Sequence, residues 1–423
     1  MEFRIATEKD TAAVKGLWDY CFETEDTPFF KYYFEKAYEP EHILVGYEGD
    51  LLAGMVHLRQ YNLNIRGAVR PVSYMVGVAT DPVARRGGIG GRLLKSSLEE
   101  LKERKQGITI LMPSKAAFYQ QYGWDLYAHQ WVQTLPLEEL RALTDKTMEF
   151  GLIKEASEWP LLAPVYEQYT KNLTGYAVRG EKEWTRLLES LFAEGVRVAY
   201  VRGPVTDEDG TAAPHGAQGK ALPPIEGYAM YRLGAEEIPV TEFVYTTRRA
   251  QRGLLNFFYN HRSQGSSIRW NEGMSDESYI FHPDGKSGHT TMPYMMSRIV
   301  DVPLAISQVP ASTDGAKEFL SKGLAAFAVR VTDPLVDWND DVFVLTITKD
   351  YKVQASRVED TTALTSPIPT ISVGALSLIL MGRMTASELV FEGKLDIPAG
   401  CEIFVEALDK LYPKQKTFIN EWW

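Results

Sequence analysis

Apolar side chains in the first 112 residues follow two spacings, one typical of strands and one of helices. Phe3 and Ile5 alternate with polar residues, and a run at helical spacing follows them as far as Cys21. Further strand patterns occupy residues 42–47, 51–58, 70–80 and 108–112. Residues 92–104 have helical spacing, so a strand, a crossover helix and another strand come in succession. This order predicts parallel pairing at the centre of a mixed sheet.

A fainter copy of this order follows in the second third of the chain. Residues 241–246 and 267–271 have the pattern of strands, and residues 248–262 have that of a helix between them. Gly253 is the only glycine in this predicted helix. We interpret the region as a degenerate duplicate that keeps the fold and has lost the chemistry. Residues 203–224 are rich in Gly, Ala, Pro and Asp, which predicts a mobile surface loop.

The last third of the chain has the pattern of a separate small sheet. Strands are predicted over residues 324–331, 342–348 and 352–357, and an amphipathic helix over residues 366–381. Chain ends normally fray, so the final pair Trp422 and Trp423 predicts a terminus buried inside the protein. We therefore expect an α+β protein of three domains, spanning residues 1–146, 147–287 and 288–423.

Composition fits a soluble globular protein and disfavours several classes. Hydrophobic residues make up 45% and charged residues 24% of the 423 positions. No apolar run could cross a bilayer and no secretory signal opens the chain, which predicts a cytoplasmic protein without a membrane partner. The net charge of −11 works against nucleic-acid binding and suits a cationic substrate. Cys21, Cys401 and the histidines show no metal-ligand spacing, so we expect no metal.

The strongest chemical signal lies between the strand that ends at Thr80 and the helix that follows. Four glycines occur within five residues there: Gly87, Gly88, Gly90 and Gly91. Backbone N–H groups at a helix N-terminus attract anions, and glycine lets a phosphate approach them closely. This arrangement is typical of a diphosphate-binding loop, with Arg85, Arg86 and Arg92 at its rim. The alternative is a glycine-rich helix start that serves only as a cap.

A second signal follows about 25 residues later, in the aromatic stretch 118–124. Tyr119 in this stretch could donate the proton that neutralises a departing thiolate, because a phenol is largely protonated at neutral pH. The alternative is that these aromatic side chains only fill the core.

Two motifs carry a resemblance to a known family. The pattern Arg85-x-x-Gly88-x-Gly90 is similar to the pyrophosphate motif of the GNAT superfamily of acyl-CoA N-acyltransferases. Residues 118–124 resemble its Phe-Tyr-x-x-x-Gly-Phe turn, and together the motifs resemble the enhanced intracellular survival (Eis) family over the whole chain. The resemblance implies tandem GNAT-like mixed-sheet domains, of which only the first has a coenzyme loop, followed by a sterol-carrier-protein-like α+β domain.

The resemblance also implies an activity. The chain would be an acetyl-CoA-dependent N-acetyltransferase that acts by direct transfer on amines of cationic small molecules, such as aminoglycosides or polyamines. It would assemble as a homohexamer. A different class of hypothesis is an acyl-CoA-responsive lipid or sterol carrier, in which residues 366–381 line a cavity for an apolar ligand.

Residue roles follow from the same resemblance. Acetyl-CoA would contact Val78, Ala79, Thr80, Arg85, Arg86, Gly87, Gly88, Ile89, Gly90, Gly91, Ser114 and Lys115. Tyr119 would be the general acid, and the α-carboxylate of Trp423 would be the base. The amine would meet an acidic and aromatic stretch containing Glu25, Asp26, Phe29, Phe30 and Tyr33. The alternative for this stretch is an ordinary amphipathic helix start.

Overall fold

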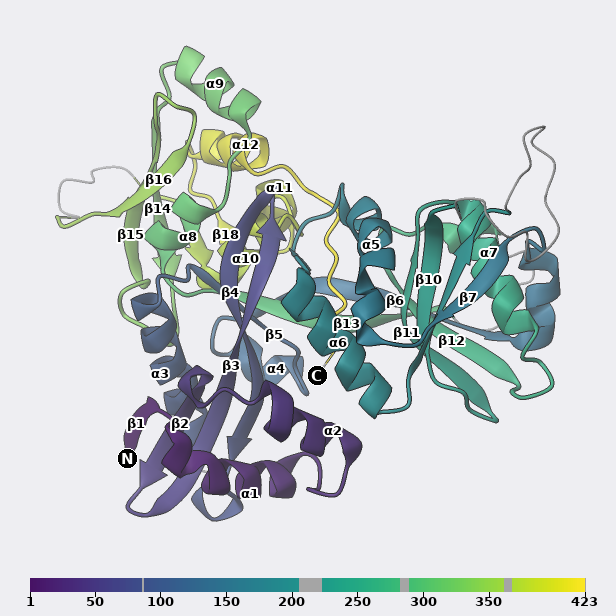
Figure 1. The fold of residues 1–423 in the computed structure, drawn as a ribbon. Coiled ribbons are helices and arrows are strands. Elements are labelled where there is room, and N and C mark those ends of the chain that lie inside the picture. The colour runs from purple at the N-terminus through teal and green to yellow at the C-terminus, as the bar shows by residue number, and fades with distance from the viewer. Residues whose placement is uncertain (86, 205–222, 282–288, 361–366, 423) are drawn as a thin grey trace.

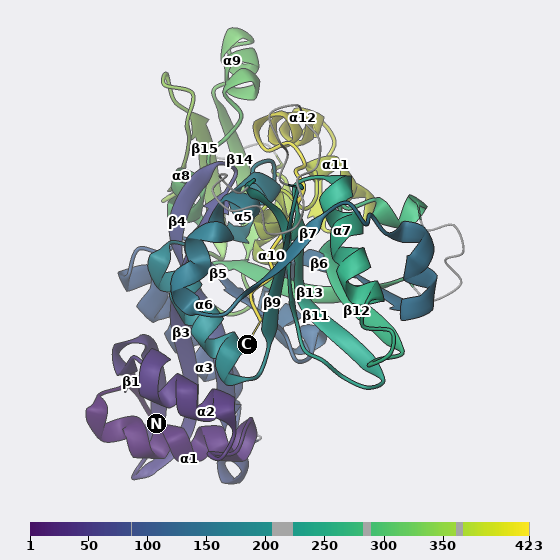
Figure 2. The same ribbon diagram turned by 45° about the vertical axis from the view of Figure 1, so that its right-hand side comes forward.

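The computed structural model describes residues 1–423 apart from 86, 205–222, 282–288, 361–366 and 423. Its strands form two sheets. The larger has thirteen strands, in the order β1-β2-β3-β4-β5-β13-β6-β12-β11-β10-β9-β7, with β8 beside β3; the smaller has five, in the order β16-β15-β14-β17-β18. Three units surround the chain end, which lies near the middle of the molecule (Figures 1 and 2).

The first unit has the predicted strand and helix order. Its strands are β1 (Glu2–Ile5), β2 (Ile43–Glu48), β3 (Leu51–Ile65), β4 (Ala68–Thr80), β5 (Ile108–Leu111) and β6 (Asp125–Pro136). Its helices are α1 (Thr11–Cys21), α2 (Pro28–Tyr32), α3 (Ile89–Glu103) and α4 (Ala116–Gln120). The parallel pairing of β4 with β5 is confirmed. Apolar side chains of α1 and α2 pack on one face of the sheet, and those of α3 and α4 pack on the other.

The second unit continues the same sheet. Its strands are β7 (Glu149–Ile153), β8 (Tyr176–Ala177), β9 (Arg197–Arg202), β10 (Ile225–Tyr231), β11 (Glu237–Tyr245), β12 (Ser267–Gly273) and β13 (His289–Ile299). Its helices are α5 (Ala163–Thr170), α6 (Glu181–Ala193) and α7 (Arg248–Tyr259). Strand β13 inserts between β5 and β6, so the two units share one sheet. Most of the predicted surface loop over residues 203–224 lies outside the described residues.

The third unit holds the smaller sheet. Its strands are β14 (Ala326–Thr332), β15 (Asp341–Ile347), β16 (Val353–Arg357), β17 (Thr370–Ser372) and β18 (Leu395–Asp396). Its helices are α8 (Val302–Gln308), α9 (Thr313–Ser321), α10 (Val373–Leu380), α11 (Ala386–Phe391) and α12 (Glu402–Leu411). The three predicted strands are confirmed, while the domain boundaries stay a prediction.

The predicted amphipathic helix over residues 366–381 is wrong in extent and character. Helix α10 begins only at Val373, because Thr370–Ser372 form β17. All eight residues of α10 are buried, since the helix packs between the small sheet and β13, where Ser377 and Ser297 hydroxyls lie 2.7 Å apart. A helix enclosed on every side needs no polar face.

The chain terminus is only partly buried as predicted. The tail after α12 runs between the units, and its residues 417–421 are buried. Trp422, however, is 40% exposed, and Trp423 lies outside the described residues. The prediction of two buried tryptophans is therefore wrong for Trp422, because its ring lies at the wall of a cavity and not in a core.

Candidate functional site

Strands β4 and β5 diverge and leave an opening in the sheet. They pair only where Ser73–Met75 lie beside Thr109–Leu111, and β4 then continues to Thr80 without β5 beside it. On its other edge, β4 has a bulge opposite β3, where Gly77 adopts φ of +58°. A side chain at Gly77 would meet the Trp18 ring at 2.6 Å, so glycine is needed. The predicted coenzyme contacts at residues 78–80 lie on this open edge.

The glycine loop leads from the opening to the N-terminus of α3. Gly88 is the N-cap residue and has φ of +70°. The first bond of the helix runs from the Arg92 N–H to the Gly88 carbonyl, so the N–H groups of residues 89–91 have no acceptor among the described residues. Free donors at a positive helix end fit a diphosphate. The residues present therefore fit the coenzyme.

The structure gives separate reasons for individual glycines in this loop. A Cβ at Gly88 would meet nothing within 4 Å, so its left-handed backbone is what requires glycine. A Cβ at Gly90 or Gly91 would instead lie 3.2 Å from Phe118 or 3.1 Å from Tyr122. These two glycines let α3 pack closely on α4 and on the turn that follows it, a reason that the sequence did not reveal.

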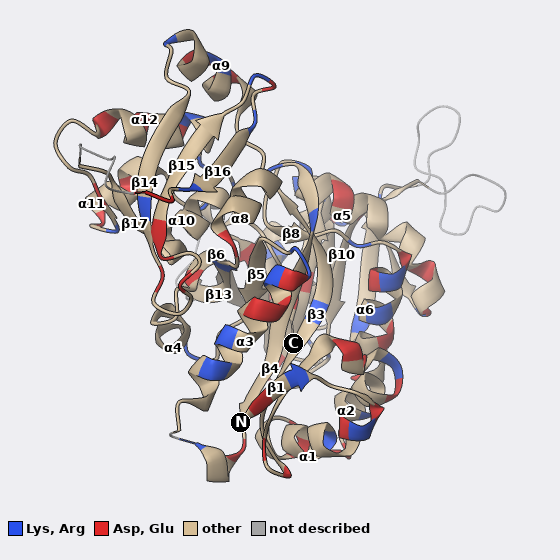
Figure 3. Cartoon of the chain, turned by 90° about the vertical axis from the view of Figure 1, so that its left-hand side faces the viewer, with Lys and Arg blue, Asp and Glu red and all other residues tan. Residues whose placement is uncertain are grey.

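The structure describes two of the three arginines at the rim of the loop. Arg85 donates from Nε to the Thr80 carbonyl at 3.2 Å, and Arg92 donates from Nη2 to the Gly87 carbonyl at 3.2 Å. Arg86 lies outside the described residues. Acidic and basic residues are interspersed along α3 (Figure 3). The predicted contacts of Arg85 and Arg86 with the coenzyme stay a prediction.

Tyr119 lies on α4 against the inner side of α3. It is 7% exposed and packs in one cluster with Leu93, Trp124 and Met75 of β4. Burial raises the pKa of its hydroxyl, and no described residue hydrogen-bonds to that hydroxyl. The phenol is therefore protonated at neutral pH and free to act as a donor. The predicted pair Ser114-Lys115 is exposed just before α4.

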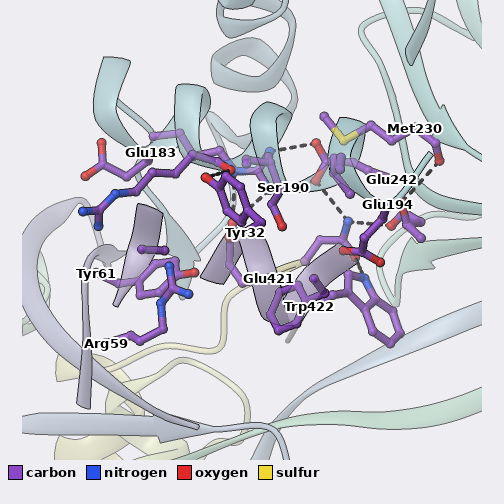
Figure 4. Close-up of a pocket in the computed structure, with 18 of the residues that line it drawn as sticks. Tyr32, Arg59, Tyr61, Glu183, Ser190, Glu194, Met230, Glu242, Glu421 and Trp422 are labelled. Carbon is purple, nitrogen blue, oxygen red and sulfur yellow. Dashed lines mark hydrogen bonds and ion pairs between the residues drawn. The ribbon is translucent and has the colours of Figure 1, made fainter. Parts of the chain in front are cut away.

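A cavity of about 680 Å³ lies near the opposite face of β4 (Figure 4). Met75 faces Tyr119, and the preceding Tyr74 faces the other side, where its hydroxyl donates to the Glu421 carbonyl at 3.4 Å. The cavity is lined from α2, β3, α6, β10, β11 and the tail. Tyr119 and the cavity therefore lie on opposite sides of the sheet.

Of the predicted substrate contacts, one lines this cavity. Phe29 is in the lining, whereas Glu25 and Asp26 are exposed outside it. Phe30 and Tyr33 are buried in the cluster around Trp18. Their contact with an amine stays a prediction. The structure adds lining residues that the sequence did not indicate, among them Arg59, Tyr61, Glu194 and Glu421.

The lining carries both signs of charge in equal number. Its acidic members are Glu23, Glu39, Glu183, Glu194, Glu242 and Glu421, and its basic members are Arg59, Arg179, Lys182, Arg186, Arg232 and Arg269. Several are paired, for example Arg186 with Glu39 at 2.6 Å. The overall negative charge of the chain is thus not concentrated among the described lining residues.

His57 on β3 lies beside the bulge of β4. It is 1% exposed, and its Nδ1 hydrogen-bonds the Tyr33 hydroxyl at 2.5 Å. Burial lowers its pKa to about 3, with the charge of Arg59 adding to the effect. The sequence indicated only that this histidine has no metal-ligand spacing, and it gave no sign of the bond to Tyr33, which lies 24 positions away.

The second unit has the same opening, but polar side chains fill it. Strands β11 and β12 pair only as far as Val240 and Trp270. Beyond that point the Tyr245 hydroxyl donates to Glu272 at 3.0 Å and hydrogen-bonds Asp276. Helix α7 is capped by the Thr247 side chain, which accepts from the Ala250 N–H at 3.0 Å. The protein's own side chains thus engage both the gap between these strands and the start of α7.

Two further features concern the described part of the chain. Within it, no three His, Cys, Asp or Glu side chains are grouped to hold a metal ion. None of its helices has the length and apolar character needed to cross a bilayer.

Comparison with known families and structures agrees with this geometry. Residues 2–127 and 175–299 match acetyltransferase (GNAT) domain families, and residues 302–420 match a sterol carrier protein domain family. No curated protein matches the sequence.

Several solved structures share the whole fold. A probable N-acyltransferase from Enterococcus faecalis has a TM-score of 0.81 at 19% identity, over 100% of this chain and 99% of that one. A GCN5-related N-acetyltransferase from Anabaena variabilis has a TM-score of 0.77 at 16% identity, and Eis1 from Mycobacterium abscessus has 0.69 at 18%, each over 100% of both chains. With two GNAT domains and a sterol carrier protein domain in this arrangement, the chain is a GNAT-superfamily acetyltransferase with an Eis-like fold.

Proposed function

We propose that the protein transfers the acetyl group of acetyl-CoA directly to an amine of a cationic small molecule, such as an aminoglycoside or a polyamine. The observation that carries this proposal is the opening between β4 and β5. Free helix donors follow it along the chain, Tyr119 packs on one side of the sheet, and the cavity lies on the other side of the sheet. A donor and an acceptor could therefore meet at the sheet from opposite faces.

The N–H groups of residues 89–91 would bind the diphosphate of the coenzyme, with Ser114 and Lys115 near its path. Backbone amides of residues 78–80 would hold the thioester carbonyl and stabilise the negative charge that develops on its oxygen. The amine nitrogen forms the new bond to the carbonyl carbon, and the carbon–sulfur bond breaks. Tyr119 gives its proton to the departing sulfur.

The attacking amine must first lose a proton, because amines are mostly protonated at pH 7. The α-carboxylate of Trp423 would accept it, since the preceding residue, Trp422, lines the cavity. A cytoplasmic location, a homohexameric assembly and the absence of nucleic-acid, membrane and metal partners belong to the same proposal.

A thiol-release assay with acetyl-CoA tests the activity against aminoglycosides, polyamines and lysine peptides. Cationic amines are expected to release thiol. Native mass spectrometry separates the alternative, because a retained lipid and no thiol release would favour a carrier.

Two variants test the catalytic roles. Tyr119→Phe is expected to lower kcat by about 100-fold, the scale of general acid catalysis, while coenzyme binding by calorimetry stays unchanged. Deletion of Trp423 is expected to abolish turnover. Unchanged rates in both variants would contradict the mechanism and leave the fold intact.

A further inference from the structure

A buried arginine of the second unit holds the C-terminal tail. Arg179, between β8 and α6, is 7% exposed, and its guanidinium lies 4.3 Å from the Tyr166 ring centre. Its Nη1 and Nη2 donate to Glu242 at 2.7 and 2.8 Å. Its Nε and Nη2 donate to Glu421 Oε1 at 3.0 and 2.8 Å. One cation therefore links β11 to the tail.

We call Arg179, Tyr228 and Glu242 the socket. The Tyr228 hydroxyl donates to Glu242 Oε1 at 2.6 Å. From the tail, Asn420 Nδ2 donates to Glu242 Oε2 at 3.0 Å and to the Thr241 carbonyl at 2.9 Å. All socket residues belong to the second unit, so the unit whose own opening is filled receives the chain end.

The socket holds the tail through buried charge. The side chains of Arg179, Glu242 and Glu421 are 2%, 3% and 8% exposed. Burial raises the pKa of Glu421, and Arg179 opposes that rise. Withdrawal of Glu421 would break its two hydrogen bonds from the Arg179 guanidinium, which is unfavourable because hydrogen bonds to charged groups are strong, while Arg179 would keep its pair with Glu242.

The anchored residues are also the wall of the cavity. Asn420, Glu421 and Trp422 all line it, and the last two are labelled in Figure 4. Trp422 Nε1 donates to Asn420 Oδ1 at 2.9 Å, and its ring lies 4.7 Å from that of Tyr294. A shift of Glu421 would therefore move the cavity wall, including the Trp422 side chain.

We propose that Arg179 is a positioning residue for acetyl transfer: through Glu421 it fixes the tail against the amine cavity. The inference rests on the proposed function, because it assigns the tail a place in the reaction. It gives the second GNAT unit a role, which is to hold the chain end at the active site of the first.

The test compares Glu421→Ala, Arg179→Met and a control in the full chain. Glu421→Ala leaves the Arg179–Glu242 pair intact and so is expected to fold. The control is Arg4→Met. Arg4 also donates two hydrogen bonds to one carboxylate, that of Asp10, at 2.8 and 2.8 Å, but neither residue lines the cavity.

Glu421→Ala and Arg179→Met are both expected to lower kcat for the amine by about 100-fold, since a misplacement near 1 Å can cost that much. The KM for acetyl-CoA should stay within about twofold of wild type, because the coenzyme loop is untouched. Amide hydrogen exchange in residues 414–422 should become faster in both variants and stay unchanged in Arg4→Met.

A wild-type kcat and unchanged tail exchange in Glu421→Ala would overturn the inference. A parallel rise of the acetyl-CoA KM and of exchange throughout the chain would also overturn it, because that result indicates a general structural role. If wild-type protein releases no thiol with any amine, the proposed function fails. The tail exchange then still decides whether the socket holds the tail.

Discussion

At the scale of single residues, His57 shows how burial changes a group that ordinarily titrates near neutral pH. A neutral imidazole is held at 1% exposure between β4 and the aromatic cluster of α1 and α2. Its pKa of about 3 means that it stays neutral in the folded protein throughout the physiological range. It can therefore accept a hydrogen bond from Tyr33 but cannot supply a positive charge.

This depressed pKa predicts acid sensitivity. In the unfolded chain a histidine binds a proton below about pH 6.5, whereas folded His57 does not until about pH 3. The unfolded state thus binds more protons in that interval, so stability falls as pH decreases from 6.5. At pH 5, His57 contributes about 2 kcal/mol to the loss in the free energy of unfolding.

Urea unfolding of wild type and His57→Gln at pH 7.5 and pH 5.0 measures this effect. The variant should lose about 2 kcal/mol less than wild type between the two pH values. Comparison within each protein removes any constant cost of the substitution. Equal losses in both proteins would contradict the assignment.

At the scale of elements, the start of α3 depends on one backbone conformation. Gly88→Ala should cost about 1–2 kcal/mol of stability, because φ of +70° is unfavourable for alanine. It should also raise the KM for acetyl-CoA by about tenfold, because relaxation of the loop turns the helix donors away from the diphosphate.

Gly49→Ala is the matched control for this prediction. Gly49 has φ of +60° and, like Gly88, nothing within 4 Å of an added Cβ, but it lies in the turn between β2 and β3. It should lose similar stability and keep its KM. Thermal unfolding and steady-state kinetics measure both quantities, and an equal KM in the two variants would argue against the loop as the coenzyme site.

At the scale of the whole molecule, one buried ion pair joins the third unit to the shared sheet. Arg298 of β13 donates from Nη2 to both oxygens of Asp333 at 2.7 and 2.9 Å, and both side chains are 0% exposed. Asp333→Asn should therefore cost about 3–5 kcal/mol in denaturant unfolding. Asp340→Asn breaks a partly exposed pair with Arg330 and should cost at most about 1 kcal/mol. Similar losses would show that burial of the pair is unimportant.

The local pattern was sufficient to predict most of the first unit. The strand, helix and strand around residues 70–112 have clear periods, and the parallel pairing follows from the crossover. The pattern failed for α10, because an enclosed helix and a buried strand are both continuous apolar runs. It also gave no sign that β13 would cross into the large sheet, since pairing partners are not encoded in one strand's own sequence.

The sequence by itself determined the order of elements in the first unit, the glycine loop and the aromatic stretch that contains Tyr119, because each depends on spacing within a few residues. Only the tertiary structure decided what forms the cavity. Glu421 meets Arg179 across 242 positions and Tyr74 across 347, and no local period relates residues so far apart. Burial, which shifts the pKa of His57 and holds the tail by paired charge, arises only when distant segments exclude water together.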